Sequence, residues 1–183
     1  MTPVALLDAN VLYPIASCDL LLRLAEADVI RIAWSDRILD EVFLALERDW
    51  GREGRCSPPA MEQGFPDALV EAAGFEARVP EGVDAGDRHV VTAALSAGAT
   101  VIVTNNASDF PAEALGPLGL GAQSLDEFLL SLLEDRPDAI AAALEAQASA
   151  LKNPSRSVAL VVGALGRSAP RFAERLAELG LLG

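Results

Sequence analysis

The sequence predicts an α/β fold of three layers, α/β/α, in which helices cover both faces of a central, mostly parallel sheet. Short apolar runs typical of buried strands alternate with longer amphipathic patterns as far as about residue 124. This alternation implies right-handed crossovers between parallel strands. After residue 124 only helical patterns follow, which predicts a C-terminal helical extension. Hydrophobic residues make up 51% of the chain and aromatic residues only 5%, as suits closely packed helices on a small sheet.

The first two strands and their helices follow from local patterns. Val4–Leu7 is an apolar run that ends at Asp8, as expected of a buried parallel strand. A leucine-rich helix should follow it, and Val29–Trp34 is expected to form the next strand. Ser35 is placed to cap a second amphipathic helix, which we expect to end near Gly51.

The middle of the chain continues the same alternation. Glycine, proline and arginine gather between Gly51 and Pro59, which predicts an exposed loop. After a further helical pattern, Phe75–Val79 is a candidate third strand. Asp87–Ser96 should be a helix that ends at Gly98, and the β-branched run Thr100–Thr104 should be a fourth strand.

The tail is predicted to be helical throughout. We divide the chain into an α/β domain, residues 1–130, and an extension, residues 131–183. The expected helical segments from residue 125 onward are Leu125–Leu133, Pro137–Leu151, Ser155–Leu165 and Pro170–Leu181.

Charge and composition limit the possible environments. The net charge is −13, and residues 1–124 carry 19 acidic and 8 basic residues, a net charge of −11. Such a charge disfavours phosphate binding unless cations intervene. The sequence begins without the pattern of a signal peptide or a membrane span, so we expect a cytoplasmic protein. Cys18 and Cys56 lack metal-binding spacing and fit reduced thiols.

Four acidic residues are the candidates for chemistry. Ligands bind outside the carboxyl ends of parallel strands, and Asp8 and Asp109 follow two of the predicted strands. Asp87 begins the helix that leads to the last of these strands, and Glu41 lies next to the apolar face of an earlier helix. Carboxylates that converge repel one another, by roughly 4 kcal/mol per pair at about 4 Å. An all-oxygen ligand set favours Mg²⁺ or Mn²⁺, and such ions support phosphodiester hydrolysis.

Four segments in order carry a resemblance to a known family. They are LLDANVLYP from Leu6, SDRILDEV from Ser35, GDRHVVTAAL from Gly86 and VTNNASDFP from Val103. These segments resemble the motifs of PIN-domain ribonucleases, especially VapC-like toxins of toxin-antitoxin pairs. The ending GAQSLDEFLLSLL fits as well, and the helical tail is similar to the extension of a subset of these toxins.

The resemblance implies an activity, a metal and partners. It implies an endoribonuclease dependent on Mg²⁺ or Mn²⁺, an antitoxin that covers the acidic pocket, and a homodimer. Asp8 and Asp87 match the principal metal-binding acids, Glu41 matches the acid on the intervening helix, and Asp109 matches the acid before phenylalanine. Asn106 stands where many relatives carry aspartate, which leaves the number of metal ions open.

For several further residues the sequence leaves two interpretations open. Asn10 either orients Asp8 or forms a turn, and Thr104 either binds a carboxylate or only favours the strand. His89 invites a general-base role, but a structural or supporting role suits its position better because it lies two residues from Asp87 on a helix. The most concentrated basic residues either contact RNA phosphates or are merely solvated; they are Arg48, Arg52 and Arg55.

Two other functions compete with the ribonuclease. Asp8-Ala9-Asn10 after a strand is superficially similar to the nucleophile motif of haloacid-dehalogenase-like phosphatases. Asn10 replaces that family's second acid, however, and the only lysine, Lys152, lies far beyond the distal acids. The other alternative is a PIN-like module that binds a partner without catalysis; carboxylate-dependent metal binding would distinguish it from an enzyme.

Overall fold

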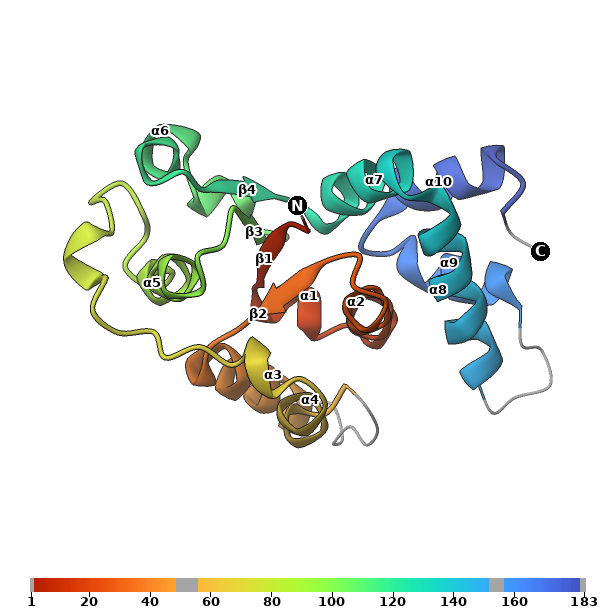
Figure 1. Ribbon diagram of the computed structural model, residues 1–183, viewed down its shortest axis with the longest axis horizontal. Coiled ribbons are helices and arrows are strands. Elements are labelled where there is room, and N and C mark those ends of the chain that lie inside the picture. Colours follow the sequence, from red (N-terminus) through yellow and green to blue (C-terminus); the bar gives the residue numbers. More distant parts are fainter. Residues whose placement is uncertain (1, 49–55, 152–156, 182–183) are drawn as a thin grey trace.

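The computed structural model describes residues 2–48, 56–151 and 157–181. A parallel four-stranded sheet lies at its centre, in the order β2-β1-β3-β4 (Figure 1). The strands are β1 (Val4–Leu7), β2 (Arg31–Ala33), β3 (Val101–Val103) and β4 (Gly121–Gln123). The neighbouring strands β1 and β3 pair with Leu7 opposite Val103, so both end at the same level. The predicted α/β class is therefore confirmed.

Helices cover both faces of this sheet. Figure 1 shows α5 (Arg88–Ala97) on one side of the strands and α2 (Ile15–Glu26) on the other. The remaining helices of the first 124 residues are α1 (Ala9–Leu12), α3 (Asp36–Arg48), α4 (Pro58–Gly64) and α6 (Ala112–Leu115). The end of α5 follows the prediction, because Gly98 adopts the left-handed conformation, with φ of 61°, that favours glycine after a helix.

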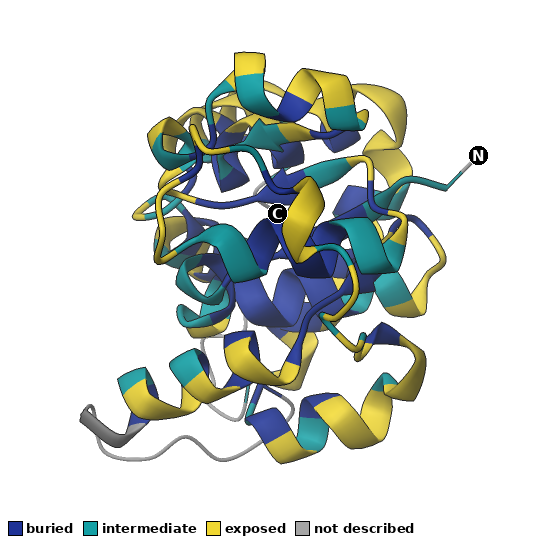
Figure 2. Cartoon of the chain, turned by 90° about the vertical axis from the view of Figure 1, so that its left-hand side faces the viewer, coloured by how far each residue is buried: buried dark blue, intermediate teal, exposed yellow. Residues whose placement is uncertain are grey.

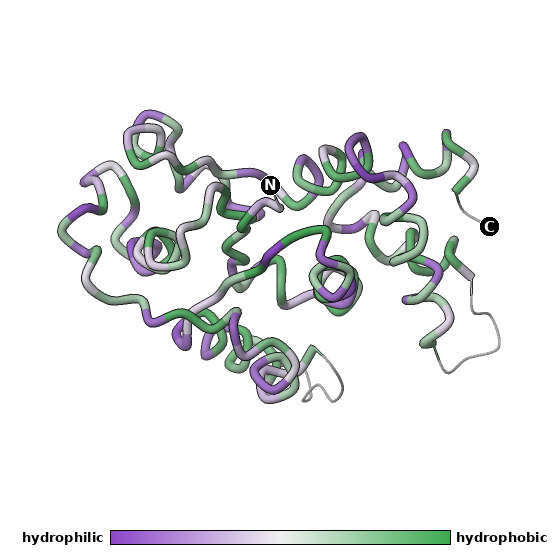
Figure 3. The backbone as a smooth tube through the Cα atoms, viewed as in Figure 1, coloured by the Kyte–Doolittle hydropathy of each residue, from purple (hydrophilic) through white to green (hydrophobic). Residues whose placement is uncertain are grey.

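The core lies between the sheet and these helices. Figure 2 shows buried residues gathered inside the molecule, and Figure 3 shows hydrophobic residues along the central strands. Leu6 and Leu7 are fully buried, and Val90 and Val91 of α5 are buried as well. Burying a side chain of this kind stabilises the fold by about 1.5–3 kcal/mol. The alternation of short apolar runs and helices thus produces one continuous core.

The tail packs on the α2 side of the sheet. It consists of α7 (Leu125–Asp135), α8 (Pro137–Ala150), α9 (Val158–Leu165) and α10 (Pro170–Glu178). Helix α8 contacts α2, and α10 contacts α7. The predicted division after residue 130 falls inside α7 and stays a prediction. Ser155, the predicted start of one segment, lies outside the described residues.

Two details differ from the sequence prediction. The strand predicted at Phe75–Val79 is wrong, because this segment forms an exposed 3₁₀ turn at Glu76–Arg78. The guanidinium of Arg88 donates to the carbonyls of Val79 and Pro80, both at 2.8 Å, which satisfies backbone groups that no strand pairs. The fourth strand along the chain is β4 (Gly121–Gln123), which is too short to carry a recognisable apolar pattern.

Two other expectations concern the environment of the chain. Cys18 and Cys56 are both buried thiols. Within the described ranges, no helix is both long enough and apolar enough to cross a membrane.

Candidate functional site

The carboxyl ends of β1 and β3 bring two functional side chains together. Because these strands are neighbours, the Asp8 amide donates to the Val103 carbonyl at 3.1 Å. Thr104 follows β3 directly, and its hydroxyl donates to Oδ2 of Asp8 at 2.6 Å. Asp8 is 6% exposed and Thr104 is fully buried. Parallel pairing therefore joins residues that are 96 positions apart.

Asp8 is held by donors on both of its oxygens. Oδ1 accepts from the Ala9 amide at 2.7 Å, so Asp8 caps the short α1, and Oδ2 also accepts from the Asn10 side chain at 2.7 Å. Asn10 in turn accepts from the Asn105 amide at 2.8 Å. Of the two readings of Asn10 and Thr104, the structure supports the one in which they orient Asp8.

The Thr104 hydroxyl uses all of its hydrogen-bonding capacity. Besides donating to Asp8, its oxygen accepts from the Asn10 side chain at 3.0 Å and from the Asn106 amide at 3.1 Å. A hydroxyl has one donor and two acceptor positions, so none remains. Asn106 itself is exposed and meets this network through its backbone.

The other three acids lie close enough to Asp8 to interact with it electrostatically. Burial raises the pKa of Asp8, and the negative charge of Asp109 raises it further, against the lowering effect of its hydrogen bonds. Burial and then the charge of Asp8 raise the pKa of Glu41. The same two causes raise the pKa of Asp87, where Asp109 and Asp84 add to the effect. Four predicted acids thus gather in one region of negative charge.

Asp87 makes no capping hydrogen bond, although it stands at the N-cap position of α5. Its carboxylate lies at the N-terminus of this helix without bonding to its amides. Asp109 lies in the 3₁₀ turn Ala107–Asp109, where its carboxylate accepts a long contact of 3.4 Å from the neighbouring Ser108 hydroxyl. Within the described part of the chain neither carboxylate has a strong partner, so both are free to meet a ligand there.

Two residues contact Glu41: Arg37, which the sequence analysis did not single out, and His89, for which it favoured a structural or supporting role. Nε of Arg37 lies 3.5 Å from Oε1 of Glu41, and Nε2 of His89 lies 3.1 Å from the same oxygen. The spacing of Arg37 and Glu41 by four residues on one helix is a signal that could have identified the arginine. The contact with His89 has no comparable local signal because it joins two helices.

The arginines for which the sequence left RNA contact and solvation open cannot be assigned to either. Arg52 and Arg55 lie outside the described residues, and so does the side chain of Arg48. Among the described residues, Arg37 is a cation that acts on the acids, since it lowers the pKa of both Glu41 and Asp87 against the larger raising effects.

The acids fit a divalent ion by their chemistry. Among the described residues no three His, Cys, Asp or Glu side chains stand close enough to share an ion as they are placed. Mg²⁺, however, commonly binds through one or two carboxylates and keeps several water ligands. Burial and the neighbouring negative charges raise the pKa of Asp8, Glu41 and Asp87, and such an ion would neutralise these charges. All the candidate donors are oxygens, which suits Mg²⁺ or Mn²⁺ better than zinc.

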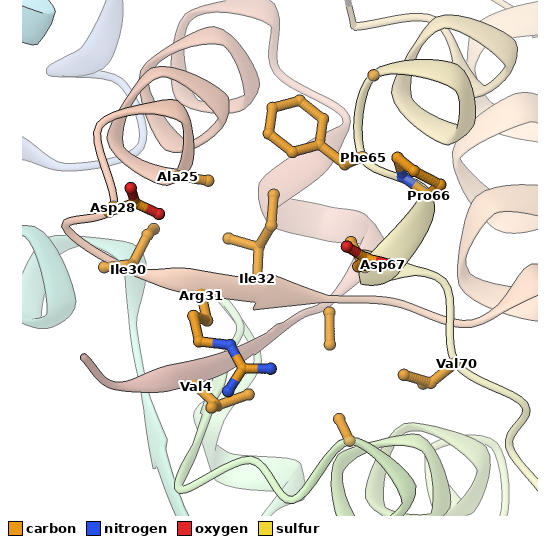
Figure 4. A pocket seen from close by; sticks show the side chains of 14 residues that line it. Val4, Ala25, Asp28, Ile30, Arg31, Ile32, Phe65, Pro66, Asp67 and Val70 are labelled. Atoms are coloured by element: carbon orange, nitrogen blue, oxygen red, sulfur yellow. The ribbon is translucent and has the colours of Figure 1, made fainter. Parts of the chain in front are cut away.

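Hollows in the surface lie beside these acids. One, of about 560 Å³, is lined by Asp84 and Asp109, and another, of about 230 Å³, is lined by Arg37 and His89. A third pocket, of about 270 Å³, lies at the β2 edge of the sheet, where Arg31, Ile32 and Phe65 line it (Figure 4). None of the four acids lines this third pocket, so it is separate from the candidate site.

Known families match nearly the whole described chain. Residues 4–108 match the PIN domain, and the chain therefore belongs to the PIN-domain family. Residues 125–178, from the start of α7 to the end of α10, match the VapC50 C-terminal domain. The prediction of a VapC-like PIN-domain chain with a helical extension is confirmed. The haloacid-dehalogenase-like alternative is not supported by these matches.

One curated relative shares substantial sequence. The chain is 37% identical over 93 residues to "Putative ribonuclease VapC50" of Mycobacterium tuberculosis (strain ATCC 25618 / H37Rv). The shared region covers 51% of this chain and 55% of the relative, so the chain spans about half the length of the relative that it matches. No solved structure matches the chain.

Proposed function

We propose that this chain is a metal-dependent endoribonuclease that acts as the toxin of a toxin-antitoxin pair. The observation that carries the proposal is the gathering of Asp8, Glu41, Asp87 and Asp109 around the carboxyl ends of β1 and β3. The name of the mycobacterial relative, which describes a ribonuclease, supports the substrate class. PIN-domain membership supports the same reaction.

Each acid has a part in this proposal. Asp8 and Asp87 would be the principal ligands of Mg²⁺ or Mn²⁺, and Glu41 and Asp109 would complete the negative pocket. A bound ion lowers the pKa of a water molecule and stabilises charge on a phosphate. Asn10 and Thr104 hold Asp8 in one orientation through hydrogen bonds of 2.7 Å and 2.6 Å.

The substrate phosphate needs a positive contact near these acids. Arg37 is the described arginine best placed for it, because it reaches Glu41 and donates to the Gly86 carbonyl at 3.4 Å, one residue before Asp87. We retain Asn106, Arg48, Arg52 and Arg55 as further candidates for RNA contact. An antitoxin with a basic segment would cover the pocket, as the net charge of −13 favours, and the toxin would form a homodimer.

The test is RNA cleavage by the purified chain and by Asp8→Asn. The original protein should cut RNA internally with Mg²⁺ or Mn²⁺ and lose this activity in EDTA. Asp8→Asn should lose cleavage while circular dichroism shows an unchanged fold. Equal cleavage by Asp8→Asn would refute the role of Asp8. A folded original protein that binds the metal ion but cuts no RNA would favour the non-catalytic alternative.

A further inference from the structure

His89 forms a side-chain contact between the helices that carry two of the acids. It is the second residue of α5, directly after Arg88 and two positions from Asp87, and it reaches across to Glu41 of α3. Nε2 of His89 lies 3.1 Å from Oε1 of Glu41, a hydrogen-bonding distance. The His89 side chain is only 10% exposed, against 39% for Glu41. A buried ring thus meets a more open carboxylate.

The surroundings of the ring fix which nitrogen carries the proton. A carboxylate only accepts hydrogen bonds, so Nε2 must be the donor in this contact. Nδ1 is buried and has no hydrogen-bond partner among the described residues. A proton on Nδ1 would therefore be buried without an acceptor, which disfavours the doubly protonated ring. The ring is therefore neutral, with Nε2 as the nitrogen that lies beside Glu41.

The contacts leave one oxygen of Glu41 open. Both His89 and Arg37 contact Oε1, and no partner of Oε2 lies in the described part of the chain. Because a neutral imidazole donates without adding positive charge, it fixes the direction of the carboxylate and leaves its negative charge in place. A second cation at this position would instead compete with a bound ion.

We propose that His89 is a positioning residue that holds Oε1 of Glu41 so that Oε2 faces the ion held with Asp8 and Asp87. The inference rests on the proposed function and deepens it. It also gives a role to the contact that His89 of α5 makes with Glu41 of α3. Partners that orient metal ligands typically affect metal affinity by about 10- to 100-fold.

Three substitutions separate this role from packing alone. His89→Gln places an amide nitrogen near the position of Nε2 and keeps a donor toward Glu41. His89→Asn has an amide that is too short to reach Glu41, and His89→Met fills the space without a donor. Thr92→Val is the matched control: Thr92 is buried on the same helix and lines the same hollow, but its hydroxyl bonds the Arg88 carbonyl at 3.0 Å.

The experiment measures the Mn²⁺ affinity of the full chain by titration calorimetry and the initial rate of RNA cleavage over a range of RNA concentrations. His89→Met and His89→Asn should weaken Mn²⁺ binding about 10- to 100-fold and slow cleavage at subsaturating Mn²⁺, with little change in the KM for RNA. His89→Gln should stay within about threefold of the original protein, and so should Thr92→Val. If His89→Met does not fold, the comparison of His89→Asn with His89→Gln tests whether a donor that reaches Glu41 is needed for Mn²⁺ binding.

A double variant identifies the partner through which His89 acts. In a Glu41→Gln background, His89→Asn should weaken Mn²⁺ binding by less than about twofold further, because the two residues act as one unit. Full additivity of the two effects would overturn the inference, as would equal Mn²⁺ binding by all three single variants. Absence of Mn²⁺ binding by the original protein would overturn the proposed function too; variants that match an active original protein would overturn only the role of His89.

Discussion

Removal of the Thr104 hydroxyl tests the network that orients Asp8. Thr104→Val keeps the β-branched shape in a fully buried position but removes three hydrogen bonds. The bond to the Asp8 carboxylate is worth about 1.5–3 kcal/mol, and each of the bonds from Asn10 and Asn106 about 0.5–1.5 kcal/mol. The added methyl group returns roughly 1 kcal/mol by apolar burial.

The expected net loss of stability is about 1.5–5 kcal/mol, which lowers Tm by roughly 3–20 °C in a chain of this length. Differential scanning calorimetry in EDTA measures this loss without a contribution from metal. Thr92→Val is the matched control, since it removes one buried hydroxyl that bonds a backbone carbonyl, and it should cost no more than about 1 kcal/mol.

The same substitution should change the pH dependence of metal binding. The Thr104 hydroxyl lowers the pKa of Asp8, against the larger raising effect of burial. Its removal raises that pKa further, so a higher pH is needed to form the carboxylate that binds the ion. The acid limb of Mn²⁺ affinity should therefore move to higher pH. Two results together would refute this account of the network. One is a Tm within about 1–2 °C of that of the original protein, and the other is an unchanged acid limb in the pH dependence of Mn²⁺ affinity.

Three further predictions follow from the charges, the tail and one turn. Asp87→Asn should stabilise the metal-free protein by less than about 1 kcal/mol at pH 7.5, because it removes a partly buried charge and its repulsion by Asp8 and Asp109, both weakened by solvent screening. Because the folded-state pKa of Asp87 is raised, this gain in stability should vanish below the ordinary aspartate pKa of about 4. Urea unfolding at pH 7.5 and below that pKa measures the gain, and an equal gain at low pH would contradict the prediction. Asp126→Ala should cost about 1–3 kcal/mol and expose the tail to proteolysis, because the buried Asp126 accepts from the Phe172 amide at 2.8 Å at the start of α10. Asp126→Asn keeps an acceptor and should cost less stability. Equal losses in the two variants would exclude a stabilising bond from Asp126 to α10. Gly98→Ala should cost about 1 kcal/mol because φ is 61° there, and an unchanged urea midpoint would show that the turn tolerates a side chain.

Much of the site was predictable because its acids follow recognisable strands. Asp8 ends an apolar run, and Asp109 follows a β-branched one, so local patterns place both at the carboxyl edge of a parallel sheet. The helix from Arg88 to Ala97 was equally visible, because the glycine after it has the conformation that ends helices. These features depend on neighbours in the chain, which a sequence displays directly.

The short elements at the margin of the sheet were not predictable. Phe75–Val79 alternates apolar and charged residues as a strand does, yet Glu76–Arg78 forms an exposed turn, and Arg88 of α5 donates to the carbonyls of Val79 and Pro80. Gly121–Gln123 carries no such pattern and nevertheless pairs with β3. Strand pairing needs a partner edge as well as a local pattern, and a sequence does not show which edge is free.

By itself the sequence determined the α/β alternation, the helical tail and the acids that follow strands. Only the tertiary structure decided how the supporting groups connect. His89 contacts Glu41 from another helix, and the Thr104 hydroxyl donates to Asp8, which lies 96 residues earlier in the chain. Hydrophobic periodicity is a local property, because it follows from the repeat of a helix or a strand along the chain. Hydrogen bonds between distant side chains depend on strand order and helix packing, which the completed core alone sets.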